Sequence, residues 1–207
     1  MRNVGSFTSE LTELKRDKKI MSEALLTPTK NIAAQLELLI SEQSIISKIA
    51  EIADRLNSEY RDKELTIVMI MKGAICLVAD LIRHIQIPCS IEFIQASSYG
   101  ARGAKRGELT IFGLENIQLA KKHVLVVDDI FDSGATLSEV MNRLKVQDPK
   151  SLKSLVLLSK KVPRKTEYNP DYVLFEIEDR FVVGYGLDYK EHYRGLPGVY
   201  ALMMENA

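Results

Sequence analysis

Short apolar segments that alternate with longer amphipathic ones constrain the fold of this chain more than any other feature. The segments 65–71 (LTIVMIM), 123–127 (HVLVV) and 155–158 are continuously apolar and rich in valine, isoleucine and leucine. Such runs are typical of strands that are buried on both faces of a parallel sheet. Helical patterns follow the first two of them, at 74–86 and 134–146. This order predicts an α/β protein with a mainly parallel sheet flanked by helices.

The segments on either side of this core carry different patterns. Residues 41–60 place apolar side chains on one helical face, which predicts a surface helix that packs on the sheet. After Pro163 the sequence alternates more and has no long helical pattern. We therefore expect three parts, which are an N-terminal segment (1–40) that contributes in part to a cap, a core (41–162) and a small cap, or hood, subdomain (163–207).

Two further strand candidates, 89–99 and 109–112, flank a polar loop at 100–107. The loop contains three basic residues and three glycines, namely Arg102, Lys105, Arg106, Gly100, Gly103 and Gly107. This composition fits a hinged lid that closes on a polyanion. A simple mobile hairpin tip would have the same composition, so both interpretations stay open.

The composition limits the class of protein. The chain has 207 residues, which suits one domain with a small appendage, and 28 basic residues balance 28 acidic ones. A formal charge of zero excludes a generic nucleic-acid binder that works through a basic surface. No apolar run approaches the length of a membrane span and no apolar signal core begins the chain, so we expect a cytoplasmic protein with no membrane partner. Cys76 and Cys89 lie in apolar stretches and are expected to be buried, reduced thiols.

The segment 124–137 (VLVVDDIFDSGATL) carries the strongest functional pattern. Ligands of open α/β sheets bind at the carboxyl ends of the strands, where this segment is expected to lie. Asp128 and Asp129 follow the buried strand at the point where it is expected to emerge into water. A tight turn at 132–136 (DSGAT) then opens a helix, so that backbone N–H groups and hydroxyls face the same place. The pattern predicts a phosphate site.

A structural interpretation of the same residues is less satisfactory. In this interpretation Asp128 and Asp129 are a solvated strand end, and Asp132 or Ser133 is an ordinary helix cap. One cap needs one residue, however, and adjacent strand residues point to opposite faces, so the two acids do not serve a single ion pair. The combination therefore favours a binding site.

The segment 124–137 resembles the phosphoribosyl-diphosphate motif of the type I phosphoribosyltransferases. Further matching segments occur in the order and at the spacing of one branch of that family, and they are MKGA at 71–74, SSYG at 97–100, LSKK at 158–161, EIEDRFVVGYGLDY at 176–189 and Arg194. The chain is similar in this respect to the hypoxanthine (6-oxopurine) phosphoribosyltransferases. The match runs from about residue 65 to 200 and is weak over the first sixty residues.

The resemblance implies a type I phosphoribosyltransferase core with a hood and a reaction of purine salvage. Such enzymes transfer the 5-phosphoribosyl group from phosphoribosyl diphosphate to hypoxanthine, with guanine as a second expected base, and release diphosphate and IMP or GMP. Mg²⁺ is the expected cofactor, phosphoribosyl diphosphate and a 6-oxopurine are the expected partners, and a homodimer or homotetramer is the expected assembly.

The resemblance also implies roles for residues of the main motif. The ribose phosphate is expected on the turn formed by Ser133, Gly134, Ala135 and Thr136. Asp128 and Asp129 are expected to face the ribose hydroxyls and the Mg²⁺ shell, since carboxylates accept from diols and suit a hard cation. Asp128 is shorter than the Glu common there in relatives, which reduces its reach. Asp132 is the expected catalytic residue, a general base or acid for the purine ring proton.

Residues outside the main motif complete the diphosphate site that the resemblance implies. Lys72 and Gly73 match the diphosphate-binding loop, where family members hold a non-proline cis peptide bond, and Arg194 matches a further diphosphate contact. Ser98 and Tyr99 open the loop that closes over the site in the family. Without the resemblance, Lys72 would be a solvated residue at a helix start.

The purine site is expected in the cap. By resemblance, Lys160 donates to the exocyclic oxygen of the purine, Phe181 stacks on the base and Val182 contributes backbone contacts. Asp188 matches a Mg²⁺ ligand and is also expected among the purine-binding residues. Lys161 is expected to face solvent.

Three alternative functions make different demands on the sequence. A transcriptional regulator with the same fold would need a basic face and would have lost Asp132, Lys160 or Phe181, all of which are present. A receiver domain would carry its acid pair after an early first strand, whereas here at least three strand candidates precede the pair. An enzyme of the same family that prefers xanthine or guanine stays open.

Overall fold

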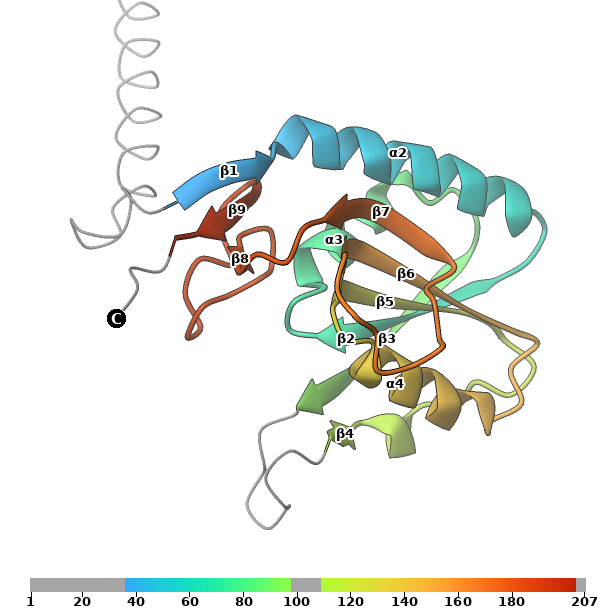
Figure 1. Ribbon diagram of the computed structural model, residues 1–207. Helices are drawn as coiled ribbons and strands as arrows, with labels where there is room; N and C mark the ends of the chain where they lie inside the picture. The colour runs from blue at the N-terminus through green and yellow to red at the C-terminus, as the bar shows by residue number, and fades with distance from the viewer. Residues whose placement is uncertain (1–35, 98–108, 204–207) are drawn as a thin grey trace, which may run out of the picture. The chain divides into compact units, whose positions relative to one another are not determined.

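The computed structural model describes residues 36–97 and 109–203, and in this part of the chain a six-stranded sheet has the order β4-β3-β2-β5-β6-β7 (Figure 1). The strands are β2 (Leu65–Met71), β3 (Cys89–Ser97), β4 (Thr110–Phe112), β5 (His123–Phe131), β6 (Ser151–Lys160) and β7 (Tyr172–Ile177). Every neighbouring pair is parallel except β3 with β4, which is antiparallel. The predicted mainly parallel α/β sheet is confirmed.

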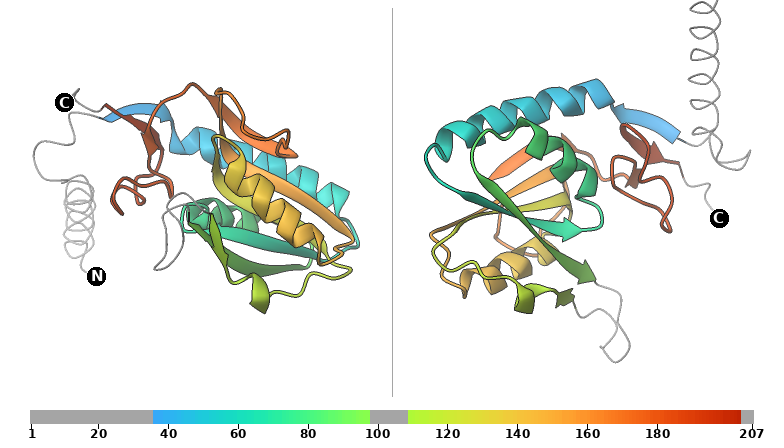
Figure 2. Two further views of the ribbon diagram at one scale, coloured as in Figure 1. Left: turned by 60° about the horizontal axis from the view of Figure 1, so that its bottom comes forward. Right: turned by 180° about the vertical axis from the view of Figure 1, so that it is seen from behind.

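Helices cover both faces of this sheet. α2 (Glu42–Glu59) and α3 (Ile75–His84) lie on one face, and α4 (Ala135–Lys145) lies on the other (Figures 1 and 2). Alternate residues of each central strand enter two different cores. Leu125 and Val127 pack with α2 and α3, whereas Val124 and Val126 pack with α4. This double burial is the physical reason why the central strands are continuously apolar.

A second, three-stranded sheet has the order β1-β9-β8, with β1 at Leu36–Ile40, β8 at Val182–Val183 and β9 at Val199–Leu202. β8 and β9 are antiparallel, with Val182 opposite Ala201. Residues 38–201 form one compact unit, and the structure describes only residues 36, 37, 202 and 203 of the other.

One predicted boundary is wrong, because the core does not end at residue 162. β7 pairs in parallel with β6, with Leu155 opposite Tyr172 and Leu158 opposite Phe175, so residues 172–177 belong to the large sheet. The alternation that suggested a separate cap is that of an edge strand with one exposed face, since Val173 is exposed between buried Tyr172 and Leu174.

The two cysteines are less buried than the sequence predicts. Cys76 and Cys89 are free thiols as expected, but both are only partly buried. Among the described residues, no helix is both long enough and apolar enough to cross a membrane.

Candidate active site

A cavity of about 540 Å³ lies at the carboxyl ends of the central strands. β2 and β5 are neighbours, so the segments that follow them meet there. Residues 70–73 and 128–134 line the cavity, together with Asp188, Glu191 and Arg194 from the loop between β8 and β9. The structure thus brings most of the predicted phosphoribosyl-diphosphate residues to one place.

The turn before α4 has the form that the sequence predicts. Gly134 precedes the helix with φ 83°, and a Cβ atom there would lie 2.9 Å from the Phe131 ring, so a larger residue would be both strained and crowded. The N–H of Lys165 donates to the Ser133 carbonyl (2.9 Å), and this hydrogen bond stabilises the turn. Ser133, Gly134 and Thr136 line the cavity, whereas Ala135 is exposed in the first turn of the helix.

The paired acids do not lie at a solvated strand end, and this expectation is wrong. β5 continues to Phe131, and Asp128 is only 6% exposed. The Asp129 N–H donates to Asp128 Oδ1 (3.0 Å), and the Ile130 N–H donates to Asp129 Oδ1 (2.8 Å). Burial raises the pKa of the Asp128 carboxyl well above its usual range, and repulsion from Asp129 raises it further. Burial also raises the pKa of Asp129. Two repelling carboxylates are therefore ready to accept hydroxyl donors or a cation.

The loop after β2 packs tightly against this pair. The Met71–Lys72 peptide bond is cis, the conformation that the resemblance implied at this loop. A Cβ atom on Gly73 would clash with the Asp129 carboxylate, and one on Gly186 would clash with the Gly73 carbonyl. Glycine at both positions lets three segments that are distant in sequence approach one another.

Lys72, Asp188 and Arg194 form a charged cluster with a residue that the sequence analysis missed. Lys72 Nζ lies 3.0 Å from Glu191 Oε2, and Arg194 Nη2 lies 3.3 Å from the same oxygen. Arg194 Nη2 also lies 2.7 Å from Asp188 Oδ1, and Asp188 Oδ2 accepts from the Glu191 N–H (2.8 Å). Hydrogen bonds from Lys72 and Arg194 lower the pKa of Glu191. Only the position of Glu191 between Asp188 and Arg194 in sequence could have indicated it.

The adjacent lysines at the end of β6 point in different directions. The Lys160 side chain is 11% exposed, and its Nζ lies 3.2 Å from Asp179 Oδ1 and 3.7 Å from Asp132 Oδ2. Lys161 is exposed and pairs with Glu178 at 2.9 Å. Strand alternation therefore directs Lys160 towards Asp132 and Lys161 towards solvent, and the exposure of Lys161 agrees with the prediction. Asp132 itself is 56% exposed, so the protein alone does not bury it.

Three of the predicted purine contacts, Lys160, Phe181 and Val182, lie outside the lining of this cavity. Phe181 is 42% exposed, and its ring meets Tyr189 edge-on at 5.5 Å between centroids. Val182 is buried in β8. Phe181 is thus not a core residue, and an exposed aromatic ring is free to receive a planar ligand. The roles of all three residues stay predictions.

Comparison with known proteins decides the family. The family model described as "Phosphoribosyl transferase domain" matches residues 36–190. The chain belongs to this family. This phosphoribosyltransferase is 41% identical over 167 residues to the hypoxanthine-guanine phosphoribosyltransferase of Aquifex aeolicus, covering 80% of this chain and 94% of that protein.

Solved structures agree with this assignment. The crystal structure of a hypoxanthine-guanine phosphoribosyltransferase from Bacillus anthracis has a TM-score of 0.74 at 37% identity and covers 80% of this chain and 98% of that one. The hypoxanthine phosphoribosyltransferase of Trypanosoma cruzi, in complex with the product IMP, has a TM-score of 0.72 at 33% identity and covers 80% of this chain and 92% of that one. The resemblance inferred from the motifs is confirmed.

Arg164 is a second residue of this phosphoribosyltransferase that the motifs did not indicate. Its guanidinium stacks over the Phe131 ring at 4.5 Å and donates to the carbonyl oxygens of Phe131 (3.2 Å) and Asp132. It also donates to Ser159 Oγ (2.9 Å). Arg164 therefore fixes the backbone that carries Asp132. It follows the LSKK segment closely, but no local pattern distinguishes it from other basic residues.

Some predicted site features lie outside the described residues, and others do not form a closed site. Ser98, Tyr99 and the lid candidate 100–107 fall in the part of the chain that the structure does not describe. Over 36–97 and 109–203, no group of three or more acidic, His or Cys side chains is arranged to hold a metal ion. Asp128, Asp129 and Asp188 line one cavity without converging on one point.

Proposed function

We propose that this phosphoribosyltransferase acts in purine salvage and transfers the 5-phosphoribosyl group from phosphoribosyl diphosphate to hypoxanthine, with guanine as a second base. The products are IMP or GMP and diphosphate. One observation carries the proposal: the Asp128–Asp129 pair, a phosphate-type turn and the cations Lys72 and Arg194 all line one cavity. The turn suits a 5-phosphate, the carboxylates suit a ribose diol and the cations suit a diphosphate, which are the parts of the proposed substrate.

The sugar and its phosphate are held by the β5–α4 segment in this proposal. The backbone N–H groups of the turn, with the Ser133 and Thr136 hydroxyls, bind the 5-phosphate. Asp128 and Asp129 accept hydrogen bonds from the ribose hydroxyls, which relieves their mutual repulsion. Fixing the sugar at three points orients the anomeric carbon for attack by a ring nitrogen of the purine.

Lys72 and Arg194 stabilise the leaving group. The transition state resembles an oxocarbenium ion, so negative charge gathers on the diphosphate as the bond to the anomeric carbon breaks. Two cations at the cavity wall offset that charge where it develops.

The base is held on the other side of the anomeric carbon. Lys160 donates to the carbonyl oxygen of the 6-oxopurine, Phe181 stacks on the ring and Val182 contacts its edge through the backbone. Asp132 lies 3.7 Å from Lys160 Nζ, so one base can reach both side chains, and Asp132 exchanges the purine ring proton.

Mg²⁺ is the proposed cofactor, and the donor set fits it. Mg²⁺ is usually bound by one or two carboxylates together with substrate phosphates rather than by a closed protein cage. Asp188, with the Asp128–Asp129 pair, offers oxygen donors at the cavity where the diphosphate is expected. The ion would supply positive charge to the diphosphate.

A homodimer or homotetramer is the proposed assembly. Ile75 and Ile82 are exposed on α3, and Ile91 and Phe93 are exposed on β3. Ile91 and Phe93 pair with Ile67 and Met69, which face the α3 side of the sheet, so the four side chains share one face. A second copy of the chain would cover them. Light scattering of the wild type and of Phe93→Lys tests this assignment.

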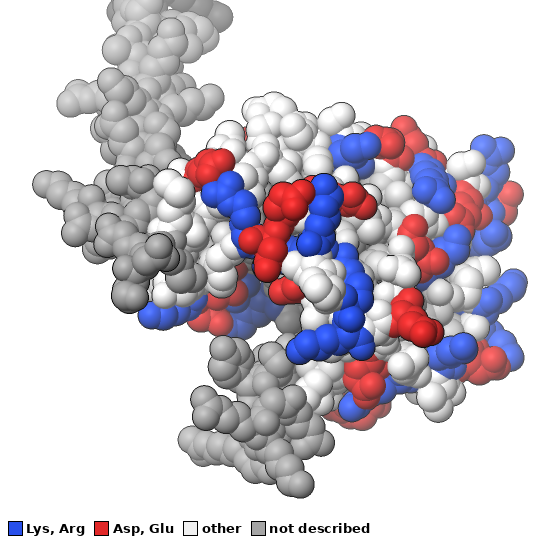
Figure 3. Space-filling view, in the orientation of Figure 1, with Lys and Arg blue, Asp and Glu red and all other residues white. Residues whose placement is uncertain are grey.

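Nucleic acid is not a proposed partner. On the face drawn in Figure 3, basic side chains are interspersed with acidic ones. Nucleic-acid binders concentrate positive charge on one surface. The cytoplasm, where purine bases are salvaged, is the proposed location.

A steady-state assay tests the proposed function directly. Hypoxanthine, guanine, xanthine and adenine are each supplied with phosphoribosyl diphosphate and Mg²⁺, and nucleotide formation is measured. We expect turnover of hypoxanthine and guanine, little of adenine, and loss of turnover after exhaustive chelation. No nucleotide from any 6-oxopurine, or undiminished turnover without a divalent cation, would contradict the proposal.

A further inference from the structure

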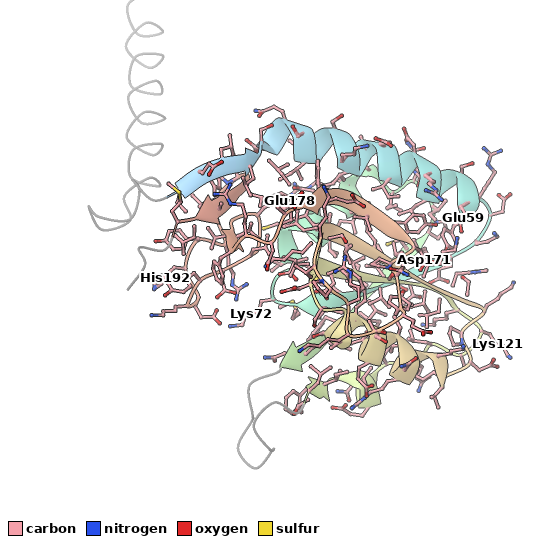
Figure 4. The ribbon with its side chains drawn as sticks, in the orientation of Figure 1. Glu59, Lys72, Lys121, Asp171, Glu178 and His192 are labelled. Carbon is pink, nitrogen blue, oxygen red and sulfur yellow. The ribbon has the colours of Figure 1, made fainter. Side chains whose placement is uncertain are left out.

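One exposed carboxylate lies where the cations of the cavity should receive their ligand. Glu191 Oε2 lies 3.0 Å from Lys72 Nζ and 3.3 Å from Arg194 Nη2, so a single oxygen bridges an ammonium and a guanidinium. All three residues line the cavity at the carboxyl ends of the strands. Figure 4 shows Lys72 at the same end of the sheet as His192, the residue that follows Glu191 in the chain.

The geometry resembles that of a bound phosphate oxygen. Lys and Arg bind phosphate and carboxylate oxygens through the same charge-assisted hydrogen bonds. Arg194 Nε is buried and has no hydrogen-bond partner among the described residues, so the guanidinium is not saturated by its protein contacts. Glu191 thus satisfies these cations only in part.

The Glu191 side chain is held weakly. It is 64% exposed, and exposed ion pairs contribute little to stability. Arg194, by contrast, is anchored independently of Glu191, because its Nη1 donates to the Gly186 carbonyl (2.8 Å) and its Nη2 lies 2.7 Å from Asp188. Removal of Glu191 therefore leaves Arg194 in place.

We propose that Glu191 is an internal counterion that occupies the diphosphate subsite of the free enzyme and is displaced by the diphosphate group. The inference rests on the proposed function, since it takes diphosphate as the ligand of Lys72 and Arg194. Displacement lowers the net affinity for diphosphate, and the returning carboxylate favours release of the diphosphate product. Glu191 is a positioning residue in this scheme and contacts no reacting atom.

The test is the binding of magnesium diphosphate to the full chain by calorimetry. In Glu191→Gln the dissociation constant should fall by about 3- to 10-fold, because breaking one or two exposed ion pairs no longer opposes binding. The KM for phosphoribosyl diphosphate should fall in parallel, while the KM for hypoxanthine stays unchanged. Glu191→Ala should change both constants in the same direction.

Glu178→Gln is the matched control, because Glu178 also pairs with a lysine but does not line the cavity. Its diphosphate affinity should equal that of the wild type. Unchanged or weaker diphosphate binding in both Glu191 variants, with wild-type unfolding temperatures, would overturn the proposal, since it would mean that Glu191 has no role or holds the cations in place. A wild-type protein that binds magnesium diphosphate but forms no IMP would contradict the proposed function instead.

Discussion

Two charged clusters of similar composition lie at opposite ends of the large sheet. Glu59, Lys153 and Tyr172 meet at the amino ends of β6 and β7, whereas Lys72, Glu191 and Arg194 meet at the carboxyl ends of β2 and β5. Figure 4 shows Glu59 and Lys72 at these two ends. Each cluster combines a glutamate with a lysine and a third polar side chain.

The two clusters differ in how completely their members satisfy one another. The Tyr172 hydroxyl donates to Glu59 Oε2 at 2.5 Å, and Lys153 pairs with Glu59 and approaches the Tyr172 hydroxyl at 3.3 Å. Burial and the hydrogen bond to Glu59 raise the pKa of Tyr172 to about 12. Burial acts to raise the pKa of Glu59, but the hydrogen bonds from Lys153 and Tyr172 outweigh it and lower the pKa.

At the carboxyl ends a glutamate, a lysine and an arginine line a cavity, and the acids beside them repel one another. The contrast indicates that a charged cluster has a functional role when its hydrogen bonds and charges are incompletely paired within the protein. A cluster whose groups pair fully with one another has a structural role. Substitutions at the two ends should therefore have different consequences. Those at the carboxyl end should change turnover, and those at the amino end should change stability.

The largest expected effect is at Asp132. Asp132→Asn keeps the phosphate turn but removes the proton acceptor, so kcat should fall by about 10²–10⁴. The KM for phosphoribosyl diphosphate should change much less. An unchanged kcat would mean that Asp132 only begins the turn before α4 and has no part in proton transfer.

The next effect is at Lys160. Lys160→Met removes the ammonium that lies 3.7 Å from the Asp132 carboxylate, and kcat/KM for hypoxanthine should fall by about 10- to 100-fold through loss of a buried charged hydrogen bond. Adenine should remain a poor substrate, because its amino group presents a donor to a donor site in the wild type and the backbone of Val182 still reads the purine edge in the variant.

Lys161→Met is the control for Lys160, because Lys161 is exposed and pairs only with Glu178 in the described contacts. Its kinetics should match the wild type. A loss of activity in Lys161→Met that equals the loss in Lys160→Met would show that the wrong lysine has been assigned to the base.

At the amino end, Tyr172→Phe should lower stability and leave turnover per folded molecule unchanged. Loss of the hydroxyl that donates to Glu59 should reduce the free energy of unfolding by about 1–3 kcal/mol, measured by urea denaturation. The lowered pKa of Glu59 means that its charge stabilises the fold above its unfolded pKa and that this stability is lost as pH falls. The difference between variant and wild type should therefore shrink below a pH of about 4.

The smallest expected effect has the opposite sign. The raised pKa of Asp128 means that its charged form is disfavoured in the folded state, which costs stability at neutral pH and ceases to do so once the carboxyl is protonated. Asp128→Asn removes the repulsion from Asp129 and can still accept the Asp129 N–H. It should raise the free energy of unfolding by about 1 kcal/mol, or roughly 2–4 °C in Tm, while impairing binding of phosphoribosyl diphosphate. A lower Tm at pH 7 would show that the acid pair is stabilising.

The fold class and the position of the phosphate turn could be predicted from the sequence alone. The apolar runs that became β2, β5 and β6 are buried on both faces, and burial of that kind leaves a continuous signal in a single stretch of chain. The DSGAT turn is equally local, because one left-handed glycine and the helix that begins after it define it.

The depth of the acid pair, the sheet to which β7 belongs and the contacts of Glu191 and Arg164 depend on the tertiary structure. β5 extends to Phe131 because β6 supplies hydrogen-bond partners along its length, with Phe131 opposite Ser159, so Asp128 is buried where its polarity suggested exposure. Glu191 meets Lys72 across 119 positions, and Arg164 meets Asp132 across 32. Contacts between residues so far apart in sequence depend on which strands pair and where their ends meet. The local pattern of one segment does not predict its distant partners.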